Sequence, residues 1–113
     1  MATSVIKKHN TTYEDLCGTN DLTVRVSKCM NVVTLYINIK TTGFVSKSTW
    51  TTLINLPQMY RPIYDVNSFV IDNTASTSEK AVVALRVMAN GDVRVWPYND
   101  NSLPTGAVTY CVL

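Results

Sequence analysis

Apolar and polar residues alternate along most of the chain in short runs that are rich in Val, Ile, Thr and Tyr. A period of two is typical of a β-strand with one buried face, and no long stretch places apolar residues at helical spacing. Gly, Asn, Asp, Ser and Pro bound the runs, as expected for turns between strands. The pattern predicts an all-β protein.

The strands can be placed from this alternation. A hairpin is expected from residues 22–27 and 32–40, and Asn90-Gly91 predicts a tight turn between two further strands because these residues adopt positive φ angles readily. The seven predicted strands are 22–27, 32–40, 48–56, 66–72, 81–89, 92–96 and 107–112. About seven short antiparallel strands predict a β-sandwich or barrel of jelly-roll type.

The alternation also assigns side chains to faces. In the first hairpin one face is predicted to carry Val33, Leu35, Ile37 and Ile39. In the Asn90-Gly91 hairpin, Leu85 and Val87 should face Val93 and Val95, with Arg86 and Arg94 on the opposite side. Trp50 is assigned to the core, on the same face of its strand as Ile54 and Leu56.

Residues 81–85 depart from this pattern, since Ala-Val-Val-Ala-Leu is apolar on both faces. An antiparallel strand with one solvated face should alternate. The second face therefore needs a cover, either a second sheet of the same chain or a neighbouring subunit. The pattern leaves both open.

Size and charge narrow the class of protein. The chain has 113 residues, 46% of them hydrophobic, which fits one domain. Its formal charge of +2 comes from scattered single charges, which argues against nucleic acid or an anionic membrane as the partner. No apolar stretch approaches the length of a membrane span. Cys17, Cys29 and Cys111 have no metal-ligand spacing, so they are predicted to be buried free thiols, with one internal pair left open.

Catalytic motifs are lacking in the sequence. His9 is the only histidine, in a polar segment, and no nucleophile elbow, phosphate loop or metal-ligand pattern accompanies it. We expect no enzyme activity, no cofactor and no metal.

Saccharide binding needs aromatic rings for the apolar sugar face and planar polar groups for the hydroxyls. One segment supplies both, and it contains Arg94, Trp96, Tyr98, Asn99, Asp100 and Asn101. The candidate site residues in this segment are Arg94, Trp96, Tyr98, Asp100 and Asn101. Alternatively, Trp96 packs on a neighbouring subunit and the polar residues only form turns. A second, weaker cluster is His9, Asn10, Tyr13 and Asp15, whose alternative is a solvated leader.

The order of elements also carries a resemblance. A hairpin, a strand ending in Leu56-Pro57-Gln58-Met59-Tyr60-Arg61-Pro62, a run closing on Asn90-Gly91-Asp92-Val93 and a last strand Val108-Thr109-Tyr110-Cys111-Val112 follow one another. In this order of elements, residues 22–113 resemble the C-terminal head domains of tail-fibre and receptor-binding proteins from phages of Gram-positive bacteria. That family has a segment similar to Leu-Pro-x-Gly-Tyr-Arg-Pro, and Met59 stands here where Gly is usual. The two prolines predict a structural role for this segment, with Tyr60 packed and Arg61 only secondarily a ligand contact.

The resemblance implies a homotrimeric head at the tip of a phage tail fibre or baseplate, made in the host cytoplasm and exposed on the virion. It implies cell-wall polysaccharide or teichoic acid as the ligand, and residues 1–21 would be a leader or the end of a stalk. A trimer axis would cover the doubly apolar strand. Two alternatives stay open: a structural trimerisation or capping module of the fibre or baseplate without its own ligand, and a cellular lectin-like module.

Overall fold

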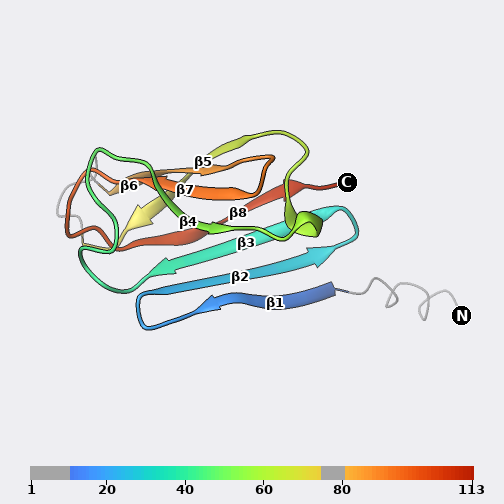
Figure 1. Cartoon of the computed structure of the whole chain (residues 1–113), viewed down its shortest axis with the longest axis horizontal. Helices are drawn as coiled ribbons and strands as arrows, with labels where there is room; N and C mark the ends of the chain where they lie inside the picture. The colour runs from blue at the N-terminus through green and yellow to red at the C-terminus, as the bar shows by residue number, and fades with distance from the viewer. Residues whose placement is uncertain (1–10, 75–80) are drawn as a thin grey trace, which may run out of the picture.

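The structure is a computed structural model that describes residues 11–74 and 81–113. These residues form eight strands and one short 3₁₀ helix, η1 (Figure 1). In chain order they are β1 (Thr11–Gly18), β2 (Leu22–Cys29), β3 (Val32–Ile39), β4 (Thr51–Asn55), η1 (Gln58–Tyr60), β5 (Val66–Asp72), β6 (Val82–Val87), β7 (Asp92–Trp96) and β8 (Pro104–Cys111).

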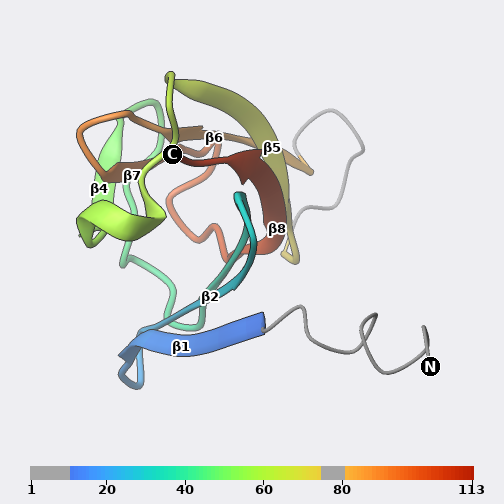
Figure 2. The same ribbon diagram turned by 90° about the vertical axis from the view of Figure 1, so that its right-hand side faces the viewer.

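All eight strands belong to one antiparallel sheet in the order β1-β2-β3-β8-β5-β6-β7-β4. Viewed along the long axis, the sheet curls around its core as a half-barrel (Figure 2). β8 pairs with β3 from Thr105 to Cys111, but it meets β5 only at Ile71 and Asp72. We therefore distinguish a first half, β1-β2-β3-β8, and a second half, β5-β6-β7-β4, joined at this short contact.

The concave side of the sheet holds the hydrophobic core. Alternate residues of the strands point inward, and burying each such side chain stabilises the fold by about 1.5–3 kcal/mol. The inward residues of the strands are Leu22, Val24, Val26, Val33, Leu35, Ile37, Ile39, Val70, Val83, Leu85, Val87, Val93, Val95, Val108 and Tyr110. The predicted all-β fold is confirmed, and so are the seven predicted strand positions, to within a few residues at their ends.

The strand β1 was not predicted. Its sequence Thr-Thr-Tyr-Glu-Asp-Leu-Cys-Gly is mostly polar, and most of its residues are exposed. β1 is an edge strand that pairs with β2 alone, and it has a bulge between Asp15 and Cys17. It therefore lacks a continuous buried face, and its sequence lacks the alternation of apolar and polar residues that such a face produces. The expected leader of residues 1–21 therefore includes a strand, β1, that belongs to the same sheet as the strands of residues 22–113. Residues 1–10 of the expected leader lie outside the described residues.

The core assignment of Trp50 is wrong, because this side chain is 37% exposed. Ser48 has a φ of 55°, which no strand residue adopts, so β4 begins only at Thr51. A bulge between Thr52 and Ile54 then shifts the register, which removes Trp50 from the face of Ile54. Leu56 is fully buried, as predicted.

The Asn90-Gly91 hairpin is confirmed with a different turn. The Gly91 amide donates to the Met88 carbonyl, the Met88 amide donates to Asp92, and only Gly91 takes a positive φ, of 100°. This is a three-residue loop with a bulge at Gly91, whereas a two-residue primed turn of the Asn-Gly type needs two positive φ angles. Leu85 faces Val95 and Val87 faces Val93, as predicted.

The segment from Leu56 to Pro62 contains η1 and is held against strands β1 and β8 by two hydrogen bonds. Tyr60 is fully buried, as predicted, and its hydroxyl donates to Oε1 of Glu14 on the edge strand at 2.7 Å. The Tyr110 hydroxyl donates to the Tyr60 carbonyl at 2.7 Å. Met59 lies in η1 with an exposed side chain, so this position does not need the Gly that is usual in the resembling family.

The three cysteines are free thiols, as predicted, but their predicted burial is wrong. Cys17 and Cys29 are half-buried, and Cys111 is exposed. Cys29 and Cys111 lie on either side of Val32 in neighbouring strands, on the convex face. In the described part of the chain, no helix has the length and apolar character needed to cross a membrane.

Candidate functional site

The convex face of the second half gathers aromatic and basic side chains. The register places Arg86 opposite Arg94 and Ala84 opposite Trp96. Because paired residues share a face, both arginines and Trp96 point away from the core. We call the following set the aromatic–arginine face: Trp50, Arg86, Arg94, Trp96 and Tyr98.

Arg94 is held in one orientation by a neighbour on its own strand. Its Nη2 lies 3.0 Å from Oδ2 of Asp92, and its side chain is about one-third exposed. Its Nε is buried and has no hydrogen-bond partner among the described residues. A buried charged donor without an acceptor is costly, so the placement of Arg94 at this position costs the fold some stability.

Asp92 is a fixed anion beside Arg94. Its carboxylate accepts hydrogen bonds from the Asn55 amide at 2.9 Å and from Arg94 at 3.0 Å. These two hydrogen bonds hold the pKa of Asp92 below its usual value, and the hydrogen bond from Asn55 has the larger effect. Asp92 therefore stays ionised at neutral pH and keeps the Arg94 guanidinium in place.

The aromatic rings form two contacts on this face. Trp96 and Tyr98 meet edge to face, with ring centroids 5.1 Å apart. The Arg86 guanidinium lies 4.6 Å from the centre of the Trp50 ring, and its Nε donates to Oδ1 of Asn67 at 3.0 Å. Two flat hydrophobic surfaces and two guanidinium groups therefore occur on one side of the sheet.

The structure brings together only part of the predicted site. Arg94, Trp96 and Tyr98 lie close to one another, whereas Asp100 and Asn101 belong to loop contacts. Oδ1 of Asp100 accepts from the Lys47 amide, and the Asn101 carbonyl accepts from the Thr74 hydroxyl. The sequence reasoning missed Trp50 and Arg86 as members of this face. The prediction that Arg86 lies on the same face as Arg94 was the signal for Arg86, and the core assignment of Trp50 concealed Trp50.

Asp72 connects the loop that contains Asp100 and Asn101 to the end of β5 through hydrogen bonds. Its Oδ1 accepts hydrogen bonds from the Thr74 amide at 2.9 Å, the Thr74 hydroxyl at 2.7 Å and the Leu103 amide at 3.1 Å. Burial by itself raises the pKa of this carboxyl group, but the hydrogen bonds outweigh burial and lower the pKa below its usual value. This loop is part of the scaffold beside the aromatic–arginine face.

The second predicted cluster is divided. His9 and Asn10 lie outside the described residues, whereas Tyr13 and Asp15 project from the convex face of β1. Asp15 pairs with Arg25 at 3.0 Å, and Tyr13 is 79% exposed. A shallow hollow of about 170 Å³ lies beside them, lined by Tyr13, Arg25, Val26, Ser27, Thr34 and Tyr36.

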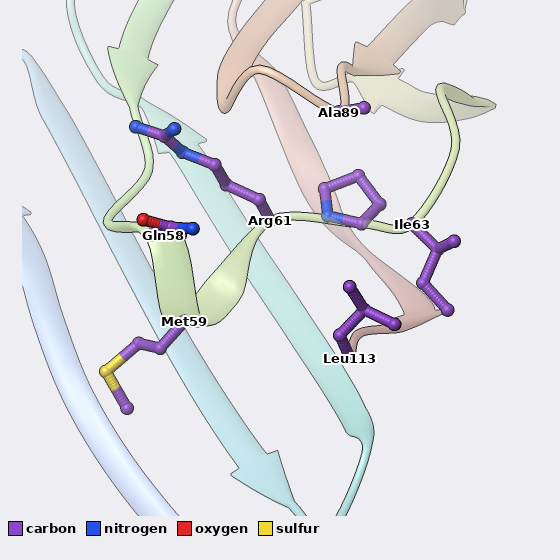
Figure 3. Close-up of a pocket in the computed structure, with 7 residues that line it drawn as sticks. Gln58, Met59, Arg61, Ile63, Ala89 and Leu113 are labelled. Atoms are coloured by element: carbon purple, nitrogen blue, oxygen red, sulfur yellow. The ribbon is translucent and has the colours of Figure 1, made fainter.

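A larger cavity of about 410 Å³ lies at the end of the half-barrel beside η1 (Figure 3). It is lined by Gln58, Met59, Arg61, Pro62, Ile63, Ala89 and Leu113. Arg61 donates from Nε to the Leu56 carbonyl and from Nη2 to Oδ1 of Asn55, so its guanidinium is used to fix the preceding turn. This agrees with the predicted structural role of the segment, and the cavity has fewer aromatic and charged groups than the aromatic–arginine face.

In residues 11–74 and 81–113, no group of three or more His, Cys, Asp or Glu side chains is arranged to hold a metal ion. Comparison of the chain with protein-family models and with curated proteins gives no match. The chain is an all-β half-barrel. Because the comparisons give no match, its function has to be inferred from the chemistry of its surfaces.

Proposed function

We propose that this chain is a non-enzymatic, saccharide-binding head domain that works as a homotrimer at the tip of a phage tail fibre or baseplate. Its ligand would be a cell-wall polysaccharide or teichoic acid of a Gram-positive host. The observation that carries the proposal is the aromatic–arginine face, where the one-third exposed side chain of Arg94 lies on the same face of β7 as Trp96. The resemblance of residues 22–113 to phage head domains supplies the biological setting.

The chemistry of this face fits a sugar polymer. The rings of Trp96 and Tyr98 offer apolar surface to the C–H groups of a sugar ring. Arg94 is already paired with Asp92, whereas the opposite arginine, Arg86, has no carboxylate partner among the described residues. The Arg86 guanidinium can therefore take an anionic group, which favours a polymer with phosphate or carboxylate groups over a neutral one.

Assembly into a trimer is supported by a second feature of the same half. On the convex side of β5 and β6, Phe69 is 69% exposed, Ile71 is 61% exposed and Val82 is 42% exposed. Ile71 and Val82 are directly paired, so the three side chains form a continuous apolar strip. No described residue of the chain covers this strip as a second sheet would, and a neighbouring subunit is the cover that we propose.

The test combines solution mass with binding. Light scattering should give the mass of a trimer, and the purified protein should bind to isolated Gram-positive cell walls. The variant Trp96→Ala should remain trimeric and bind at least tenfold more weakly. Tyr64→Ala is the matched control, because Tyr64 is 81% exposed and lies outside the aromatic–arginine face. A stable monomer, or a trimer in which Trp96→Ala binds like the wild type, would contradict the proposal.

One observation favours the structural alternative, a trimerisation or capping module without its own ligand. Phe69, Ala84 and Trp96 form one cross-strand row, so a subunit that covers Phe69 also approaches Trp96. In that case Trp96→Ala should weaken the trimer, and no cell-wall polymer should bind. The two functions therefore differ in whether Trp96→Ala changes binding or mass.

A further inference from the structure

We infer that the hollow on the convex face of the first half is a second saccharide subsite that takes a single sugar ring. We call it the tyrosine hollow and define it by Tyr13, Arg25, Ser27, Thr34 and Tyr36. It belongs to the half of the sheet that does not contain the aromatic–arginine face. The ligand class rests on the proposed function, because both sites would engage the same polymer.

The register gives the tyrosine hollow its shape. Tyr13 is opposite Ser27, which is opposite Thr34, and Asp15, Arg25 and Tyr36 form the next row on the same face. The two tyrosines therefore stand at diagonal corners, two strands apart, which is about 10 Å across the sheet. Ser27 and Arg25 lie on the strand between them, and the small Ser27 side chain leaves the floor of the hollow low beside Tyr13.

The polar groups at the border are suited to sugar hydroxyls. Arg25 and Asp15 pair at 3.0 Å with 61% and 70% of their side chains exposed, so both remain accessible for further hydrogen bonds. The Thr34 hydroxyl is 3.0 Å from that of Thr109 on the next strand, which extends the polar border. Rings on two sides with hydroxyl, guanidinium and carboxylate groups around them match the apolar face and polar edge of a pyranose.

These side chains contribute little to the fold. An exposed ion pair such as Arg25–Asp15 stabilises a protein only slightly. Tyr13 lies on an edge strand with most of its surface in solvent, and its hydroxyl has no hydrogen bond to any residue that the structure describes. A ring held this far from the core is available to a ligand, and removing it should leave the fold intact.

The experiment is a titration of the ¹⁵N-labelled full chain with the methyl glycosides of glucose and N-acetylglucosamine, followed by NMR. Saturable shifts are expected at the amides of Tyr13, Ser27 and Tyr36. Tyr13→Ala and Ser27→Phe, which fills the hollow, should each weaken this binding at least tenfold. Tyr64→Ala, at a residue that lies outside both sites, should leave it unchanged.

The outcomes separate the two sites. If neither glycoside produces saturable shifts at the hollow, the second subsite is overturned, and loss of cell-wall binding in Trp96→Ala would still support the proposed function. If the hollow responds and Trp96→Ala binds cell walls like the wild type, the subsite is supported and the aromatic–arginine face is overturned as the main site. Folding of each variant is checked by its far-ultraviolet circular dichroism.

Discussion

The two halves of the sheet are alike on their concave side and differ on their convex side. Inside, both are lined by Val, Leu and Ile. Outside, the first half carries polar residues such as Arg25, Ser27 and Thr34 between its tyrosines. The second half carries Phe69, Ile71 and Val82 there, with two tryptophans beside them.

This difference separates what the fold requires from what a partner requires. The concave residues are needed in both halves because one shared core stabilises the sheet. The convex side of the first half is mostly polar, and its apolar surface is limited to Val32 with its neighbours Cys29 and Cys111, so it has less to gain from a cover. The apolar convex side of the second half is left in solvent by the described residues, and it is there that a second molecule would gain most by binding.

The largest effect should separate the two sides of β6. Leu85→Ala removes a fully buried side chain and should lower the free energy of unfolding by about 2–5 kcal/mol. Val82→Ala, on the convex side of the same strand, should lower the free energy of unfolding of the isolated subunit by less than about 1 kcal/mol. Urea denaturation measures both, and equal losses would contradict the division into core and exposed strip.

The two hairpin turns should respond in opposite directions. Gly91 has a φ of 100°, and a Cβ there would lie 2.9 Å from the Leu56 carbonyl oxygen, so Gly91→Ala should destabilise the protein by about 1–3 kcal/mol. Met30 has a φ of 56° with an exposed side chain. Met30→Gly relieves this strain and should stabilise the protein by about 0.5–1 kcal/mol. Thermal unfolding of both variants measures these changes, and a loss in Met30→Gly would show that the turn is not strained.

The contact between the halves should depend on pH through Asp72. Its pKa is lower in the folded protein than in the unfolded chain, so its contribution is complete above the unfolded value and is lost as the pH falls through the folded value. The wild type should therefore lose stability below about pH 4. Asp72→Asn should be less stable at pH 7 by about 1–3 kcal/mol and should lose less on acidification. Urea denaturation at pH 7 and pH 3 tests this, and parallel losses would exclude Asp72 as the group responsible.

Most of the fold was predictable because strands with one buried face leave a period of two in the sequence. The faces of Leu85, Arg86 and Arg94 followed from that period, whereas the register between the two strands is set by a three-residue loop that the Asn-Gly pair did not predict. β1 was not predictable in this way, because an edge strand with polar residues has no buried face. Trp50 was misplaced because a positive φ at Ser48 and a bulge in β4 change the register without any sign in the hydrophobic pattern.

The candidate site was predictable only where it lies along one strand. Arg94 and Trp96 are two residues apart and share a face by simple alternation. Trp50 reaches the same face from a segment more than forty residues earlier in the chain, and its contact with Arg86 depends on the sheet order. Asp100 and Asn101 were included because they follow Trp96 in the sequence, although their contacts are with other loops.

The position of β8 has a consequence for how the chain is made. β8 comes last among the eight strands in chain order, yet it lies in the middle of the sheet, between β3 and β5. A ribosome therefore releases β1 to β3 and β4 to β7 as two incomplete pieces with unpaired edges before residues 104–111 appear. Closure of the half-barrel waits for this strand to enter between them, so the sheet is completed only after the other seven strands have been synthesised.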